Sequence, residues 1–149
     1  MIKGKEGTVR LGVGEQLYKV QEFDHIVVGP CGVILIETKY YNGKIIIDQY
    51  GNWIREREDG KQVGERNPVQ QIERHHMIAE EILGISDIHD VVCIAHDGAI
   101  MIGIENSVVP IVKYDMLVHY IKNLTNKSGK LYSENEQKEL IHKIESQLL

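Results

Sequence analysis

The chain has 149 residues and a formal net charge of −5, with 42% hydrophobic and 26% charged residues. This is the composition of an ordinary globular protein, and we expect one domain over residues 1–149. The acidic balance argues against binding nucleic acid through a broad basic surface. Two cysteines are too few for a disulfide framework and lack metal-binding spacing. No apolar run reaches the ~20 residues of a transmembrane helix, and the start lacks the apolar core of a signal peptide. We expect a reduced, cytoplasmic setting without membrane attachment.

Residues 8–13 (TVRLGV) and 16–23 (QLYKVQEF) are rich in β-branched and aromatic residues and predict strands. Two apolar runs within residues 22–39 then predict an antiparallel hairpin. They are separated by GPCG at positions 29–32, which is typical of a tight turn. The sequence therefore predicts an extended start to the chain that leads into a hairpin.

The register of this hairpin brings charged side chains together. With the middle two residues of GPCG at the centre of the turn, Asp24 lies directly opposite Glu37. The strand period places Lys39 on the same face as Glu37. Facing carboxylates repel each other, and a divalent cation removes the repulsion. The hairpin therefore predicts a metal site formed by Asp24 and Glu37, with Lys39 beside it.

The strand over residues 32–39 is apolar on both faces, as a covered central strand should be. Asn-Gly at positions 42–43 predicts a second hairpin that returns the chain to Asp48. In that register Asp48 faces Glu37, either as a further acidic residue of the cluster or, as we favour, as a cap of the strand end. Trp53 is expected in the core, with base stacking as the alternative.

A helix is predicted from Asn67-Pro68, with Asn as the N-cap and Pro at the first position, to Gly84. Apolar residues at steps of three and four predict its buried face. His76 lies on that face and is expected to be a core histidine. The members of that face are Val69, Ile72, His76, Ala79 and Leu83. Gln71 and His75 share a neighbouring face, and for His75 we favour a solvent-facing position without a functional role.

Three further strands are expected, over residues 90–95, 99–104 and 108–112. The last should lie at a sheet edge because Pro110 cannot donate a hydrogen bond. A helix over residues 114–124 follows, and a capping box of Ser133 and Glu136 opens a final helix. The whole pattern predicts an α/β (α+β) fold in which a mixed central sheet, with strands in hairpins, is flanked by helices.

The sequence resembles the nuclease-related domain (NERD) family of the PD-(D/E)XK nuclease superfamily. The resemblance is carried by EFDHIVVGPCGVILIETKYYNGKI, GNWI and NPVQQ, within residues 14–84. It implies a restriction-endonuclease-like core and hydrolysis of phosphodiester bonds with Mg²⁺ or Mn²⁺. The implied partner is nucleic acid, with DNA expected.

The resemblance also assigns roles to residues. It implies Asp24 and Glu37 as metal ligands and the main-chain carbonyl of Thr38 as a third ligand. Lys39 would orient or deprotonate the attacking water and stabilise developing charge. The resemblance places Gln71 near the metal, where it would hold substrate or water.

The likeness is weaker before the hairpin. Residues 14–15 (Gly-Glu) resemble the pair that opens the first helix of the family, but only eight residues separate Glu15 from Asp24. That is too few for a helix, a turn and a strand, so the helix is either missing or replaced by a strand. Glu6 and Glu15 are alternative further metal ligands, with a surface position favoured for both. An edge left open in this way predicts pairing with a second copy in a homodimer.

Two other functions are alternatives to an active nuclease. One is a module that binds nucleic acid without cleaving it, and the other is an oligomerisation module in which a cation only stabilises the fold. Metal-dependent turnover distinguishes the nuclease from both. Binding of nucleic acid at low salt distinguishes the two modules from each other.

Overall fold

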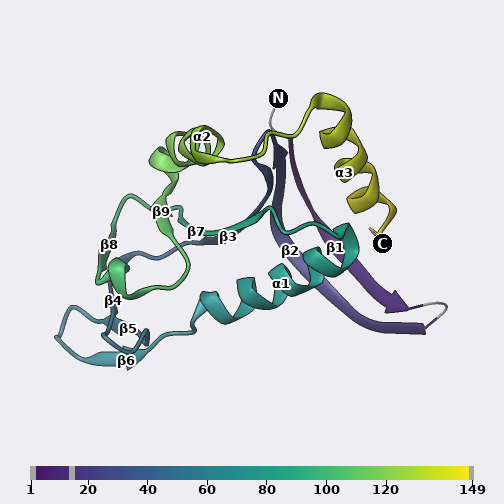
Figure 1. Ribbon diagram of the computed structural model, residues 1–149. Helices are drawn as coiled ribbons and strands as arrows, with labels where there is room; N and C mark the ends of the chain where they lie inside the picture. Colours follow the sequence, from purple (N-terminus) through teal and green to yellow (C-terminus); the bar gives the residue numbers. More distant parts are fainter. Residues whose placement is uncertain (1–2, 14–15, 148–149) are drawn as a thin grey trace.

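The computed structural model describes residues 3–13 and 16–147, with side chains from Phe23 to Gln147 (Figure 1). Its strands form two mixed sheets. In spatial order, the first sheet contains β1 (Lys3–Val13), β2 (Gln16–Gly29), β3 (Gly32–Lys39), β7 (Ile88–Ile94) and β9 (Ile111–Lys113). The second contains β6 (Gln62–Gly64), β5 (Trp53–Glu56), β4 (Gly43–Ile47) and β8 (Ala99–Ile102). The helices are α1 (Pro68–Leu83), α2 (Leu117–Lys127) and α3 (Glu134–Ser146), with 3₁₀ turns η1 (Ile104–Asn106) and η2 (Tyr114–Met116). The mixed α/β architecture with flanking helices is confirmed.

The hairpin of β2 and β3 has the predicted register. Gly29 pairs with Gly32, and the ladder continues to the pair of His25 and Ile36. Before it, β1 and β2 form a long antiparallel ribbon that reaches away from α2 in Figure 1. Of the two readings of this segment, the strand is the one that the described residues adopt.

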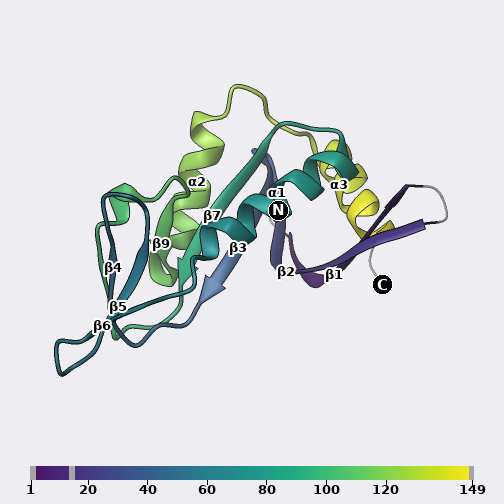
Figure 2. The ribbon, with the colours of Figure 1, turned by 90° about the horizontal axis from the view of Figure 1, so that it is seen from below.

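The central strand β3 is covered on both faces. Val33 and Leu35 belong to a core shared with α1 and α3, whereas Ile34 and Ile36 belong to a smaller core shared with α2. In Figure 2, α1 crosses in front of the first sheet and α2 lies behind it. The continuous apolar run of β3 is therefore explained by helices on both sides of the sheet.

The predicted second hairpin is wrong, and the reason is the position of β3. This strand already pairs with β2 on one edge and with β7 on the other, so no edge is left for β4. The chain instead crosses into the second sheet, where β4 pairs with β5 and β8. Gly43 begins β4 at a φ of +109°, and its N–H donates to the carbonyl of Gly98 at 3.1 Å. The connection from β3 to β4 and the connection from β7 to β8 thus pass side by side from the first sheet into the second.

Asp48 consequently lies away from Glu37 and caps a turn. Its exposed carboxylate accepts hydrogen bonds from the main-chain N–H groups of Asn52 at 2.8 Å and Tyr50 at 2.9 Å. The bond from Asn52 is the main cause that lowers the pKa of Asp48. The capping role that we favoured is confirmed, and the membership of an acidic cluster is wrong.

Most helix boundaries follow from local signals. The Asn67 side chain accepts from the N–H of Val69 at 2.9 Å, and Gly84 ends α1 in the left-handed conformation. The capping box of Ser133 and Glu136 opens α3. Residues 114–116 form a 3₁₀ turn, so α2 begins later than predicted, and β9 is an edge strand directly after Pro110 as expected.

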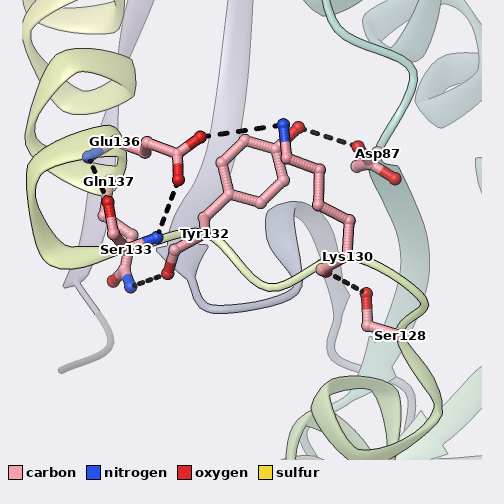
Figure 3. Close-up of polar contacts among 7 residues, drawn as sticks. All are labelled: Asp87, Ser128, Lys130, Tyr132, Ser133, Glu136 and Gln137. Carbon is pink, nitrogen blue, oxygen red and sulfur yellow. Dashed lines mark hydrogen bonds and ion pairs between the residues drawn. The ribbon is translucent and has the colours of Figure 1, made fainter.

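The segment between α2 and α3 is hydrogen-bonded to the turn of the β2–β3 hairpin and to Asp87, which directly precedes β7. Figure 3 shows its bond to Asp87. The hydroxyl of Tyr132 donates to Asp87 Oδ2 at 2.7 Å, and its N–H donates to the carbonyl of Pro30 at 2.8 Å. The amide of Gln137 donates to the carbonyl of Tyr132 at 2.9 Å. Burial, followed by the bond to Asp87, raises the pKa of Tyr132 to about 12. These bonds hold the turn that determines which residues of β2 and β3 face each other.

Candidate active site

Asp24 marks the point where β2 separates from β3. The ladder ends at His25 and Ile36, and the next donor of β3 on that edge is the N–H of Thr38. This N–H donates to Asp24 Oδ2 at 3.0 Å. The carboxylate therefore takes the place of the main-chain acceptor that a continued ladder would supply, and it is held at the carboxyl end of the central strand.

Glu37 is the buried acid of the site. Only 2% of its surface is exposed, and the strand period places it on the face of β3 that packs toward α1. Burial raises the pKa of Glu37, the charge of Asp24 raises it further, and Lys39 opposes both effects. The charge of Asp24 thus disfavours the ionised form of Glu37, and a cation between the two carboxylates would favour it.

Lys39 lies between the buried Glu37 and solvent and forms an ion pair with Glu37. Its Nζ lies 3.3 Å from Glu37 Oε1, and a quarter of its side chain (25%) is exposed. Among the side chains from Phe23 to Gln147, this ammonium group has Glu37 as its carboxylate partner, and it is partly exposed to solvent.

The main chain of Thr38 also points into this region. The neighbouring carbonyl of Lys39 accepts from the N–H of Ala95, which places the polar groups of Lys39 on the β7 side. Because main-chain groups alternate between the two edges of a strand, those of Thr38 point to the opposite edge. There the N–H of Thr38 meets Asp24, and the carbonyl of Thr38 opens on the same edge.

Helix α1 brings Gln71 and His75 toward the site. Because β3 and β7 are parallel, the intervening helix runs in the opposite direction, and its first turn returns to the carboxyl end of β3. Gln71 is half-buried in that first turn. His75 is 3% exposed, and its ring stacks on Phe23 with centroids 4.2 Å apart. Burial lowers the pKa of His75, and the nearby charge of Asp24 partly offsets this effect. The solvent-facing position favoured for His75 is therefore wrong.

The expected core position of His76 is also wrong. Its Nδ1 lies 2.9 Å from Asp90 Oδ1, and its Nε2 lies 2.9 Å from Glu80 Oε1. Burial alone would lower the pKa of His76, but the hydrogen bonds and charges of Asp90 and Glu80 raise it. The buried face of α1 therefore includes His75 and not His76. His76 instead meets a polar partner on the sheet, Asp90 of β7.

The donors at the end of β3 fit a hard divalent cation. They are two carboxylates and a carbonyl, and Mg²⁺ is commonly held by one or two carboxylates with water in its other positions. Among the side chains from Phe23 to Gln147, no group of three or more His, Cys, Asp or Glu residues converges on a metal position. The main chain of Glu6 stands at a register shift between the pairs of Lys5 with Ile26 and Gly7 with Phe23, across from the two residues Asp24 and His25. The side chain of Glu6 and the whole of Glu15 lie outside the described part of the chain.

Sequence reasoning missed a cluster beside this site, formed by Tyr41, Arg55 and Glu65. Arg55 lies over the ring of Tyr41, and its Nε donates to Glu65 Oε2 at 2.8 Å. In the sequence, the region around Arg55 is one of mixed charge. The alternation of Arg and Glu at positions 55–58 nevertheless indicates a strand with charges of opposite sign on its two faces. Within β5, which ends at Glu56, the strand period places Arg55 and Glu56 on opposite faces, whereas Arg57 and Glu58 lie beyond the strand.

The fold and the site together define an α+β protein of nuclease-like architecture, with paired carboxylates and a lysine at the end of a central hairpin. The family model described as the nuclease-related domain matches residues 8–112, more than half of the chain. The chain belongs to the nuclease-related domain family. This membership indicates a nuclease-related function and an interaction with nucleic acid. Comparison with curated proteins and with solved structures finds no match. No helix among the described residues is long and apolar enough to cross a membrane.

Proposed function

We propose that this protein is a nuclease that uses a divalent metal ion, Mg²⁺ or Mn²⁺, to hydrolyse phosphodiester bonds in DNA. The observation that carries the proposal is a buried Glu37 that faces Asp24 and has the Lys39 ammonium 3.3 Å away, at the open end of the central strand. An ion pair at a sheet rim accounts for Glu37 and Lys39 but not for a second carboxylate that raises the pKa of Glu37. Membership of the nuclease-related domain family supports the same function.

Each residue has a chemical role in this proposal. Asp24, Glu37 and the carbonyl of Thr38 supply oxygen ligands. The bound ion would acidify water and offset the negative charge of the phosphate. Lys39 has donors that can orient the attacking water or bind a non-bridging phosphate oxygen. The amide of Gln71 would fix the position of water or substrate from the first turn of α1.

A cleavage assay with labelled single- and double-stranded DNA and RNA tests the proposal, in Mg²⁺, in Mn²⁺ and in chelator. We expect metal-dependent cleavage by the wild type, none by Glu37→Gln, and cleavage slowed by about 10²–10⁴ in Lys39→Ala. Asp48→Asn is the matched control because it removes a carboxylate from an exposed turn outside the site. Activity retained by both site variants would show that the cleavage occurs elsewhere, and a wild type without cleavage under every condition would disprove the proposal.

A silent binding module is the second candidate, and one observation favours it. The described residues before the hairpin form strands β1 and β2, where the resemblance places a helix with a further acid. Calorimetric titration of Mg²⁺ and Mn²⁺, with and without an oligonucleotide, distinguishes the two candidates when combined with turnover. Tight binding of the oligonucleotide without any cleavage would favour the module.

The associated assembly is a homodimer. β1 lies at one end of the five-stranded sheet, so one of its edges remains open for pairing. Light scattering at micromolar concentration checks this prediction, and a monomeric mass would contradict it.

A further inference from the structure

We propose that Arg55 is a phosphate-binding residue that holds the nucleic-acid strand against the carboxylate site, an inference that rests on the proposed function. The proposal starts from the position of the Arg55 guanidinium, which lies on the inner face of the second sheet and over the ring of Tyr41, just after the carboxyl end of β3. Four structural features support it: the face on which Arg55 lies, the way it is held, the charges around it, and the groove beside it.

The register of the second sheet places Arg55 on the side of the site. Arg55 pairs directly with Ile45, and paired residues share a face. Ile45 and Trp53 are buried in the same core as Val33 and Leu35 of β3. Arg55 follows Trp53 by two residues and therefore extends this inner face beyond its apolar part.

Two neighbours hold the guanidinium in place. Its carbon lies 5.6 Å from the ring centroid of Tyr41, and its Nε is bound to Glu65 at 2.8 Å. Tyr41 is buried, and burial, followed by the charges of Glu65 and Glu37, raises its pKa to about 12, with Arg55 acting in the opposite direction. Tyr41 follows Lys39, the last residue of β3, by two positions, so the guanidinium over its ring lies near the carboxyl end of β3.

The bond to Glu65 uses Nε, which leaves the terminal N–H donors of the guanidinium for another acceptor. About a third of the Arg55 side chain (35%) is exposed. A partly exposed guanidinium that lies over an aromatic ring and has terminal N–H donors besides its Nε bond can bind a phosphate through two parallel hydrogen bonds. This combination distinguishes Arg55 from an arginine that extends freely into solvent.

The charge of the whole chain makes such a contact necessary. A protein with a net charge of −5 gains no general attraction for a polyanion. Contacts to phosphate then depend on local cations: Lys39 at the carboxylate site, and Arg55, which Tyr41 and Glu65 hold in a fixed position.

A shallow groove of about 490 Å³ opens beside Arg55. Its lining consists of Asn42, Gly43, Arg55, Arg57 and the acidic residues Glu56, Glu58 and Asp59. Of the acidic residues, Glu56 is neutralised by Lys44 at 2.9 Å on the outer face of the same sheet. Asn42 and Gly43 of its lining directly follow Tyr41 in the chain, so the groove and the Arg55 guanidinium lie on the side of Tyr41.

A purely structural ion pair between Arg55 and Glu65 predicts a different response to mutation. If the pair only stabilises the protein, Arg55→Gln and Glu65→Gln should change binding in the same direction. If Arg55 binds phosphate, Glu65→Gln removes a repulsive carboxylate and tightens binding, whereas Arg55→Gln weakens it. The sign of the two effects therefore separates the two roles.

The experiment measures fluorescence anisotropy of a short labelled DNA duplex in Mg²⁺, between about 50 and 200 mM salt. The variants are made in a Glu37→Gln background to prevent cleavage, and wild-type cleavage is measured in parallel. Arg55→Gln should weaken binding about tenfold or more and reduce the slope of log affinity against log salt by about 0.9. Arg55→Lys should keep the slope and lose part of the affinity, because an ammonium cannot make the bidentate contact. Lys130→Gln is the matched control, since Lys130 also lies over a tyrosine ring and pairs with a glutamate, Tyr132 and Glu136, but outside the groove.

An unchanged salt slope in Arg55→Gln, an equal effect of Lys130→Gln, or weaker binding by Glu65→Gln would overturn the inference. If these results came with metal-dependent cleavage by the wild type, the proposed function would stand and only the role of Arg55 would fall. If the wild type neither bound nor cleaved nucleic acid, both would fall. Thermal unfolding of each variant shows whether the fold is intact, and Arg55→Lys keeps the test decisive if Arg55→Gln does not fold.

Discussion

Replacing Glu37 by Gln preserves the size of a side chain that is only 2% exposed and removes its ionisable group. In the folded protein, burial and then Asp24 raise the pKa of Glu37 above its ordinary value of 4.5. The native state therefore binds more protons than the unfolded state in the pH range between the two pKa values. The stability that Glu37 contributes in the metal-free protein is fully present below pH 4.5 and is lost as the pH rises through the folded-state pKa.

One additional bound proton sets the size of this effect. The free energy of unfolding of the metal-free wild type should fall by at most about 1.4 kcal/mol per pH unit within that window. At about 2–4 °C per kcal/mol for a chain of this size, the corresponding fall in Tm is about 3–6 °C per pH unit. Glu37→Gln lacks this contribution, so the variant should become more stable than the wild type as the pH rises in the presence of chelator.

Metal binding should reverse that order. A ligand at a hundred times its Kd stabilises the folded state by about 2.7 kcal/mol, which corresponds to a rise in Tm of about 5–11 °C. The wild type should show this rise with Mg²⁺ at neutral pH, whereas Glu37→Gln, with one carboxylate fewer, should not. Asp48→Asn should respond like the wild type, because Asp48 caps a turn outside the site.

Scanning calorimetry of the three proteins from pH 5 to 8 (about one to four units above the ordinary carboxyl pKa), with chelator or with Mg²⁺, measures both effects. The difference between wild type and Glu37→Gln isolates the titration of Glu37 from that of other groups. Identical pH dependence in these two proteins, together with equal shifts on adding Mg²⁺, would refute the assignment of Glu37 as a buried metal ligand.

Three further substitutions test separate parts of the structure. Lys39→Ala should lower the kcat of metal-dependent cleavage by about 10²–10⁴ with little loss of Tm, because a partly exposed ion pair stabilises weakly; unchanged kcat in steady-state kinetics would remove Lys39 from the reaction. Gly32→Ala should destabilise the protein by more than about 1–2 kcal/mol, since Gly32 has a φ of +105° and an added Cβ would contact the carbonyl of Asp87; a loss below this range in urea unfolding would contradict the description of the turn. Tyr132→Phe removes the 2.7 Å bond to Asp87 and should lower the free energy of unfolding by about 1–2 kcal/mol; an unchanged urea midpoint would show that this bond does not fasten the turn.

Local signals in the sequence were sufficient for the hairpin and the helix ends. The GPCG turn fixes which residues of β2 and β3 pair, so the opposition of Asp24 and Glu37 followed from counting along two strands. The same is true of the N-cap Asn67 and of the capping box at Ser133, because each depends on hydrogen bonds between residues close in sequence. Such contacts are determined by residue type and spacing before any tertiary packing occurs.

Helix periodicity was less decisive for the two adjacent histidines. His75 and His76 differ by about 100° around the helix axis, and either could complete an apolar stripe. The choice depends on what the sheet offers beneath α1: Phe23 of β2 stacks on His75, and Asp90 of β7 bonds to His76. Neither partner is a neighbour of the helix in sequence.

The sequence by itself determined the central hairpin, the position of its carboxylates and lysine, and the family to which the chain belongs, since these depend on a short stretch with a defined register. Tertiary structure decided where β4 goes, because β3 has both edges occupied by strands distant in sequence. It also decided which charge of the 55–65 region lies over Tyr41, since the pairing of β5 with β4 puts Arg55 on the inner face of the second sheet. Pairing between distant strands is governed by which edges remain open and which faces must be buried, and these are properties of the assembled sheet rather than of any one segment.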